Sequence, residues 1–311
     1  MTALRQMMQD ALEVRGMAPR TQDAYLGAVG LLARYYKRSP DTLSAAQVQG
    51  YLLHLRRERG RSVATLNQYG CAFRFLFGTV LGLDGTQFQI PLAAVPQRLP
   101  QILSRREISQ LFEVTQHESA RTFLKLAYAT GLRLSELCHL RVADIDSQDD
   151  RMCIRVQQGK GGKDRYVPMA QDVLDLLRQH WRLAGLTRQH PWLFPSPENA
   201  SRPISAGTPQ KWYHAARAAA AISKQGGIHT LRHCYATHTL EAGVDVYTLS
   251  RWLGHGHVST TSRYLHLVRP DVPDGAKRAP LALLTALPLL TKHDPGDQAP
   301  VPASGPASGP A

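Results

Sequence analysis

Long apolar runs are missing from this chain of 311 residues, although 43% of its residues are hydrophobic. No stretch approaches the roughly 20 apolar residues that a membrane-spanning helix needs. The first ten residues, MTALRQMMQD, contain no apolar signal region before a cleavage site. We therefore expect a cytoplasmic protein with no membrane partner, and the length suggests about two domains.

Cysteine and clustered metal ligands are also scarce. The chain has four cysteines, at positions 71, 138, 153 and 234, and none of them belongs to a C-x-x-C pair. This spacing supports neither a zinc ribbon nor a dense disulfide framework, and it fits a reducing compartment. The sequence also has no carboxylate cluster and no phosphate-loop motif that would hold magnesium and ATP. We expect no metal and no cofactor.

Positive charge, in contrast, is abundant. The chain has 37 Lys and Arg against 24 Asp and Glu, which gives a net charge of +13. Counting by segment, residues 1–100 carry 12 basic and 6 acidic residues, and residues 101–291 carry 24 and 16. The excess therefore lies in both globular parts and not in a basic tail. This distribution is typical of a protein that binds a nucleic acid. The alternative is a soluble basic protein without such a partner.

The first 84 residues have the pattern of a small helical bundle. We expect a weak helix over residues 3–15, and Thr21 is the expected N-cap of the next helix. Ser44 opens a capping box, S-A-A-Q, and Ser62 opens a fourth helix that ends before Gly82. Residues 85–103 then form the expected linker, because they contain three prolines and few periodic apolar positions.

From residue 104 onward the pattern is mixed, and we predict a second domain over residues 104–270. Two alternating segments, 151–156 and 164–169, are expected to be strands on either side of the glycine-rich turn QQGKGGK. The fold class is therefore mainly α with a small β-hairpin in an α+β second domain. The predicted helices of this domain cover 105–114, 119–130, 133–140, 171–184, 206–222, 229–241, 246–253 and 258–267.

Five short polar motifs follow one another through the second domain: GLRLSEL, GKGGKDR, HTLRH, LGH and RY. Together they resemble the tyrosine site-specific recombinases, the phage integrase family, whose pattern is Arg, Lys, His-x-x-Arg, His and a nucleophilic Tyr. The resemblance covers about residues 100–267. The N-terminal bundle is similar to the SAM-like core-binding domain of the family. The flanking motifs are similar to Xer-like and integron-like integrases, and the subfamily stays open. The matching residues are Arg133, Lys160, His229, Arg232, His255 and Tyr264.

These residue types suit phosphoryl transfer to a tyrosine. A tyrosine hydroxyl can act as the nucleophile and form a covalent protein–phosphate bond, which conserves the energy of the phosphodiester. Because a guanidinium is planar and always charged, Arg133 and Arg232 suit the non-bridging phosphate oxygens. His255 is expected to donate a further hydrogen bond to the phosphate.

The resemblance implies the remaining roles. It makes Lys160 the general acid that protonates the leaving 5′ oxygen, and it makes His229 a proton acceptor or phosphate ligand near Tyr264. Glu136 lies one helical turn beyond Arg133 and is expected to orient the site. Lys163, on the same hairpin, is the alternative to Lys160.

A zinc site is the alternative interpretation of His229 and His233, which are spaced i, i+4. We do not expect one, because Thr230 stands where a zinc protease carries Glu and no third ligand follows at a suitable spacing. His233, His238 and His257 are expected to be structural or to contact DNA.

The predicted function is site-specific DNA recombination through a 3′-phosphotyrosyl intermediate, in a bacterial cytoplasm. The alternatives are a type IB topoisomerase, which relaxes DNA without synapsis, and an inactive DNA-binding regulator. The resemblance implies double-stranded DNA as the partner and a tetramer of this chain on two DNA sites. Residues 271–291 are the expected C-terminal docking segment, whose apolar part packs either on a neighbouring protomer or on its own domain. Residues 292–311 are expected to be a disordered tail.

Overall fold

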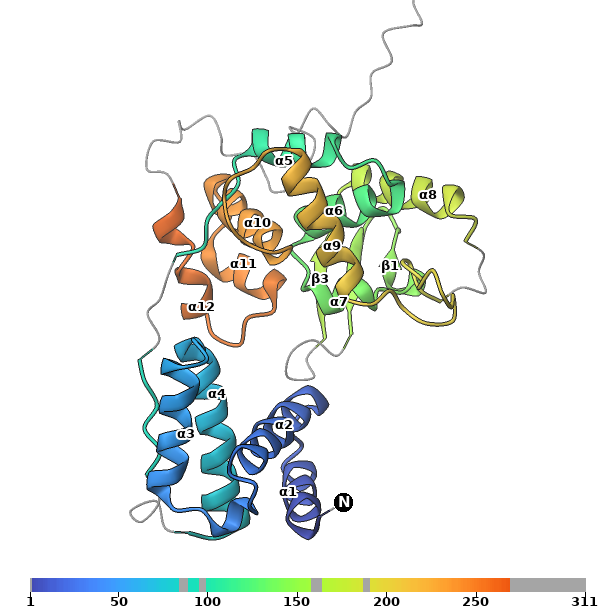
Figure 1. The fold of residues 1–311 in the computed structure, drawn as a ribbon. Coiled ribbons are helices and arrows are strands. Elements are labelled where there is room, and N and C mark those ends of the chain that lie inside the picture. Colours follow the sequence, from blue (N-terminus) through green and yellow to red (C-terminus); the bar gives the residue numbers. More distant parts are fainter. Residues whose placement is uncertain (1, 84–88, 95–98, 158–163, 187–190, 269–311) are drawn as a thin grey trace, which may run out of the picture. The chain divides into compact units, whose positions relative to one another are not determined.

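The computed structural model describes residues 2–83, 89–94, 99–157, 164–186 and 191–268 (Figure 1). Over these ranges the chain forms twelve α-helices, several short 3₁₀ or π segments and one three-stranded sheet. The mainly helical class with a small sheet is thus confirmed. Two compact units can be separated, Met1–Arg98 and Leu99–Ala311. None of the helices in the described ranges is long and apolar enough to cross a membrane.

The N-terminal unit is a bundle of four helices. Helix α2 packs against α4 and α1, and α3 packs against α4. Ser44 and Ser62 cap their helices as expected, and Ser44 forms the predicted capping box with Gln47. The helices and short segments are α1 (Ala3–Val14), α2 (Pro19–Tyr36), η1 (Pro40–Thr42), α3 (Ala45–Arg57), α4 (Val63–Arg74) and η2 (Phe75–Val80).

The start of α2 corrects one expectation. Thr21 was expected to cap this helix, but the helix begins two residues earlier, and Ala18 is its N-cap. The reason is Pro19 at the first helical position, where the fixed φ of proline favours the helix and its missing N–H is not needed. Thr21 instead donates its backbone N–H to the carbonyl of Ala18 within the first turn.

Parts of the expected linker, residues 85–103, contribute to the two cores. Ile90 is buried in the N-terminal core, and its carbonyl accepts a hydrogen bond from Arg74 at 2.7 Å. Leu103 is buried in the core of the C-terminal unit. Within the described parts of this segment, one residue therefore packs into each core.

The C-terminal unit is built around α6, whose residues are mostly buried. This helix contacts α5, α7, α8, α9 and α10 (Figure 1). His117 caps its start, and Gly131 ends it in the left-handed conformation (φ 59°), which glycine adopts without steric cost. The helices of this unit are α5 (Arg105–Glu113), α6 (Glu118–Thr130), α7 (Leu134–Cys138), α8 (Gln171–Leu183), α9 (Gly207–Ala219), α10 (His229–Glu241), α11 (Val246–Leu253) and α12 (Ser259–Ser262). Its short 3₁₀ segments are η3 (Val142–Asp144) and η4 (Leu265–Leu267).

An antiparallel sheet of order β1-β2-β3 lies beside these helices. The expected hairpin strands are present as β2 (Cys153–Val156) and β3 (Arg165–Pro168), with Ile154 opposite Val167. The third strand, β1 (Ile145–Asp146), was not expected, because two residues carry no readable periodicity. The turn at 158–163, with Lys160 and Lys163, lies outside the described residues.

Two expected helices are shorter in the structure. The helix expected over 133–140 is α7, which spans five residues, and Arg133 precedes it as an extended N-cap. The helix expected over 258–267 is divided into α12 and η4, and Tyr264 lies between them. Each break leaves a candidate site residue, Arg133 or Tyr264, just outside a helix. The direction of its side chain is therefore not set by the repeat of the helix.

We predict that Gly131→Ala destabilises the C-terminal unit far more than Gly185→Ala. Both glycines have φ near 60°, but a Cβ at Gly131 would overlap the ring of Tyr235, whereas a Cβ at Gly185 meets nothing within 4 Å. The left-handed backbone alone should cost about 1–2 kcal/mol, and the overlap should add about 1–3 kcal/mol. Thermal unfolding of the two variants measures the difference, and equal losses would contradict it.

Candidate active site

Arg232 is the most deeply buried cation of the predicted set, with an exposed fraction of 3%. It lies on α10 and donates to the carbonyls of Gly131 and Leu253, each at 2.6 Å. These carbonyls belong to the C-cap of α6 and the last residue of α11. Carbonyls at helix C-termini have no partner within their own helix, and the helix dipole favours a cation there. Arg232 therefore joins three helices at one point.

A carboxylate, Glu136, organises the second arginine. Arg133 donates to Glu136 through its side chain and its backbone N–H, both at 2.8 Å. Arg165 on β3 also donates to Glu136, at 2.8 and 2.6 Å, in a bidentate pair. Arg133 donates in addition to the carbonyl of Gly254 at 2.7 Å. The carboxylate thus lies between two guanidiniums, as the orienting role expected of Glu136 requires.

The charges of this network have shifted pKa values. Burial alone would raise the pKa of Glu136, but the hydrogen bonds and charge of Arg165, with those of Arg133, outweigh it and lower the pKa to about 2. Burial, reinforced by the charge of Arg133, lowers the pKa of Arg232 to about 10. Glu136 is therefore ionised and Arg232 protonated at neutral pH.

His255 follows α11 and contacts both Arg232 and Thr261. Its Nε2 lies 3.1 Å from a guanidinium nitrogen of Arg232, and its Nδ1 lies 2.7 Å from the Thr261 hydroxyl. Burial and the nearby arginines, Arg232 first, lower the pKa of His255 to about 4. A guanidinium can only donate, so Nε2 accepts and Nδ1 carries the hydrogen. In this state His255 can donate to a phosphate through Nε2 only after it gains a proton.

Tyr264 is buried, with an exposed fraction of 3%. Its hydroxyl is 2.8 Å from Nδ1 of His233, and its ring stacks near that of His255, with centroids 6.5 Å apart. Burial raises the pKa of Tyr264, although the charges of Arg232, Arg263 and Arg133 oppose the change. The hydroxyl therefore stays protonated at neutral pH and needs a base before it can attack a phosphorus.

Four of the residues predicted from the sequence thus form two bonded pairs, Arg133 with Glu136 and Arg232 with His255. The two arginines donate to the adjacent carbonyls of Gly254 and Leu253, which brings the pairs together. Tyr264 joins them through its ring contact with His255. His229 is solvent-exposed at the start of α10, and its ring meets that of His233 at 5.0 Å. The Tyr264 hydroxyl forms its hydrogen bond with Nδ1 of His233, a residue that the sequence interpretation left as structural or DNA-contacting.

Two further residues were missed, Arg165 and Thr261. Arg165 ends the motif GKGGKDR and is the first residue of β3, and its 9% exposed side chain binds Glu136 and the Trp252 carbonyl. Its place after two lysines made it look like one more surface cation. Thr261 orients His255 from three residues before Tyr264. The signal that could have found it is the run of hydroxyl residues at 259–262.

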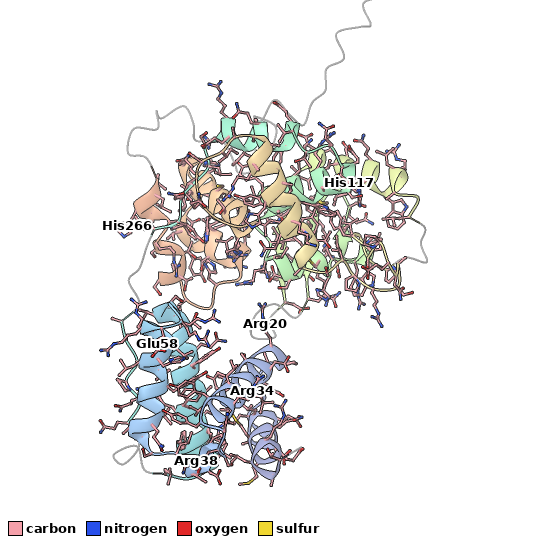
Figure 2. The ribbon with its side chains drawn as sticks, viewed as in Figure 1. Arg20, Arg34, Arg38, Glu58, His117 and His266 are labelled. Atoms are coloured by element: carbon pink, nitrogen blue, oxygen red, sulfur yellow. The ribbon has the colours of Figure 1, made fainter. Side chains whose placement is uncertain are left out.

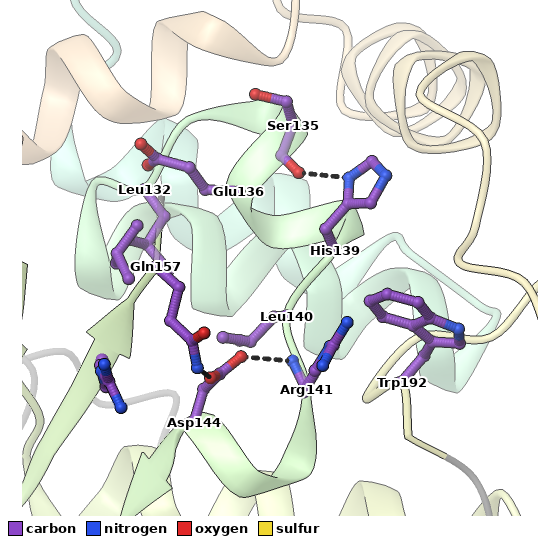
Figure 3. A pocket seen from close by; sticks show the side chains of 11 residues that line it. Leu132, Ser135, Glu136, His139, Leu140, Arg141, Asp144, Gln157 and Trp192 are labelled. Carbon is purple, nitrogen blue, oxygen red and sulfur yellow. Dashed lines mark hydrogen bonds between the residues drawn. The ribbon is translucent and has the colours of Figure 1, made fainter. Parts of the chain in front are cut away.

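Two hollows border the site. One, of about 900 Å³, is lined by basic side chains that include Arg133, Arg165, Arg251 and His255. The other, of about 550 Å³, lies on a different side of Glu136 and is shown in Figure 3. There the Arg141 guanidinium lies 5.0 Å from the Trp192 ring centroid. Within the described residues no three His, Cys, Asp or Glu side chains are grouped so that they could hold a metal ion.

Two family models match the two units of the chain. The model of the phage integrase family matches residues 101–269, and the model of the phage integrase N-terminal SAM-like domain matches residues 4–86. The chain is 37% identical over 273 residues to the candidate integrase/recombinase y4qK of Sinorhizobium fredii, covering 88% of this chain and 87% of the relative. It is 33% identical over 272 residues to the tyrosine recombinase XerA of Thermococcus kodakarensis, covering 87% and 93%. The chain belongs to the phage integrase family.

Solved structures show the same fold. A lambda integrase tetramer bound to a Holliday junction superposes with a TM-score of 0.68 at 19% identity, over 84% of this chain and 76% of that one. The XerH site-specific recombinase bound to palindromic difH substrate gives 0.66 at 20% identity, over 88% and 84%. The family and enzyme class predicted from the sequence, a tyrosine recombinase, are confirmed, and the two alternatives are not favoured.

We predict that Glu136→Gln removes stability at neutral pH and that the loss disappears in acid. The folded pKa of about 2 lies below the ordinary glutamate pKa of 4.5, which corresponds to about 3 kcal/mol of stabilisation at neutral pH. This stabilisation is fully present above pH 4.5 and is lost as the pH falls toward 2. Wild type and variant should therefore differ most above pH 5 and converge near pH 2, in unfolding experiments across this range.

The matched control is Asp175→Asn. Asp175 also pairs with an arginine, Arg178, but at 3.6 Å and with both side chains more than half exposed. An exposed pair of this kind contributes about 0–1 kcal/mol, so the control should change little at any pH. A Glu136→Gln loss that stays constant from pH 7 to pH 2 would contradict the account.

Proposed function

We propose that this chain performs site-specific DNA recombination with Tyr264 as the nucleophile and with Arg133, Arg232 and His255 around the scissile phosphate. The observation that carries the proposal is the joining of Arg232, His255 and Tyr264 by direct contacts in one buried cluster. Two guanidiniums beside one tyrosine hydroxyl suit a reaction in which negative charge develops on phosphate oxygens.

The chemical steps follow from these positions. The Tyr264 oxygen attacks phosphorus, and the bond from phosphorus to the 5′ oxygen breaks, which leaves a 3′-phosphotyrosyl bond. Lys160 is the proposed general acid for the 5′ oxygen, with Lys163 as the alternative on the same turn. The phosphotyrosyl bond conserves the phosphodiester energy, so rejoining needs no nucleotide cofactor. A 5′ hydroxyl from the partner duplex then attacks and completes the exchange.

Double-stranded DNA is the proposed partner, and its proposed binding site is the hollow that is lined by basic side chains. The hollow of about 900 Å³ contains Arg133 and His255, and its rim carries exposed Arg151 and Arg251. The N-terminal unit adds exposed arginines of its own, among them Arg20, labelled in Figure 2. Affinity spread over many phosphate contacts should fall steeply with salt.

Assembly and location are also part of the proposal. One similar solved structure is a tetramer on a Holliday junction, and we propose a tetramer of this chain on two DNA sites. Residues 271–291 are proposed to dock on a neighbouring protomer, and a bacterial cytoplasm is the proposed location. The domain limits stay those predicted from the sequence: 1–84, a linker over 85–103, and 104–270.

We predict that Tyr264→Phe abolishes the covalent protein–DNA adduct while DNA binding stays nearly intact. The change removes the hydroxyl that attacks phosphorus and keeps the ring packing and the net charge. Denaturing gels of a nicked substrate measure the adduct, and gel shift measures binding. Tyr247→Phe is the control, because Tyr247 is 62% exposed on α11 and should keep the adduct. An adduct with Tyr264→Phe would mean that another residue is the nucleophile.

A bridging-sulfur substrate should separate the roles of Lys160 and the arginines. A thiolate needs no proton to leave, so sulfur at the scissile 5′ position should restore cleavage by Lys160→Ala. It should not restore Arg133→Ala or Arg232→Ala, whose expected losses are about 10²–10³ in rate. DNA affinity should change little in all three variants. If the sulfur substrate rescues Lys163→Ala instead, the general acid is Lys163.

A further inference from the structure

The hydroxyl of Tyr264 has a specific partner that family motifs did not indicate. Nδ1 of His233 lies 2.8 Å from the Tyr264 oxygen, which is a hydrogen-bond distance, and the ring centroids are 5.7 Å apart. His233 directly follows Arg232 on α10 and stands one turn after His229. The helix therefore presents Arg232 to the buried carbonyls and, at the next residue, a titratable ring to the nucleophile.

The protonation state of His233 suits an acceptor. Burial comes first among the causes that lower its pKa to about 4, followed by the charges of the groups that face it: His229 and Arg232 from α10, and Arg263 from the segment that carries Tyr264. The ring is therefore neutral at neutral pH. A neutral imidazole has one donor and one acceptor nitrogen, and with the hydrogen on Nε2 the Nδ1 atom accepts from the tyrosine hydroxyl.

We propose that His233, and not His229, is the base that takes the proton of Tyr264 during DNA cleavage. The proposal rests on the proposed function and names a catalytic residue for it. In the step, the Oη–H bond of Tyr264 breaks and the proton moves to Nδ1 of His233. The Oη–P bond forms, the bond from phosphorus to the 5′ oxygen breaks, and the 5′ oxygen takes a proton from the general acid.

The reverse step balances in the same way. When a 5′ hydroxyl attacks the phosphotyrosyl bond, its proton passes to the deprotonated general acid of the cleavage step, and His233 returns its proton to the departing Tyr264 oxygen. Burial is the main cause of the low pKa of His233, and the positive charges around it lower the pKa further. The negative charge of a bound phosphate would offset these positive charges and make the transfer easier. The base is thus weak in the free protein and strengthened when the substrate phosphate occupies the site.

The competing account is that His233 only positions the hydroxyl. The two accounts differ in what a side chain without a titratable group can do. Asparagine at 233 keeps a polar atom near the position of Nδ1 but takes up no proton, whereas alanine removes the contact altogether. Positioning alone predicts that His233→Asn works and His233→Ala fails, and proton transfer predicts that both fail.

The experiment is single-turnover cleavage of a bridging-sulfur substrate from pH 5 to pH 9. This substrate makes the general acid unnecessary, so the pH dependence reports the base. We expect both His233→Asn and His233→Ala to lose about 10²–10⁴ in rate at pH 7. Their rates should keep rising by about tenfold per pH unit, since hydroxide must then generate the tyrosinate, while the wild-type rate levels off.

Three further measurements keep the outcomes distinct. His266→Ala, an exposed histidine two residues after Tyr264, should keep the wild-type profile. DNA affinity and circular dichroism should match wild type in both His233 variants, which excludes simple loss of folding. His229→Ala should keep the shape of the wild-type pH profile whatever its rate.

Near-wild-type cleavage by His233→Asn would overturn the proposal in favour of positioning. A His229→Ala profile that rises like that expected for His233→Ala would overturn it in favour of His229. Failure of the wild-type chain to form any adduct would contradict the proposed function itself, which is a separate result.

Discussion

The ion triad of Glu136 with Arg133 and Arg165 is the interaction on which the rest of the site depends. A carboxylate with 9% exposure is costly to bury unless it is paired and fully hydrogen-bonded, and here four hydrogen bonds from two arginines meet it. The same carboxylate caps α7 and fixes Arg133 as its extended N-cap. Because Arg165 is the first residue of β3, the same carboxylate also connects this strand to Arg133.

Helix ends supply the second constraint. Arg232 satisfies carbonyls at the ends of α6 and α11, and Arg133 satisfies that of Gly254, the C-cap of α11. Two cations are thus held close together by the partial negative charge of helix C-termini and by one carboxylate. Burial is the main cause of the lowered pKa of Arg232 and of His255, and the charges of the neighbouring arginines add to it. The negative charge of the proposed scissile phosphate would offset these positive charges.

The sequence was sufficient for the parts that follow local rules. The capping box at Ser44 predicted the start of α3. The resemblance of the polar motifs to the tyrosine recombinases grouped Arg133, Arg232, His255 and Tyr264 as one set. Local rules could not decide between His229 and His233. Both lie on one face of α10, and which ring meets Tyr264 depends on the break between α12 and η4 that turns the tyrosine toward the helix. Arg165 was equally hidden, because its partner Glu136 lies 29 residues away.

The central claim is that Tyr264, buried beside two arginines and a neutral histidine, is the residue that attacks the DNA phosphorus and becomes linked to a 3′ phosphate. Peptide mass spectrometry of the trapped wild-type adduct tests it most directly. After nuclease and trypsin digestion, the account predicts a nucleotide attached through its 3′ phosphate to the peptide that starts at Tyr264, directly after Arg263. A nucleotide on any other peptide, or one attached through its 5′ phosphate, would contradict the account.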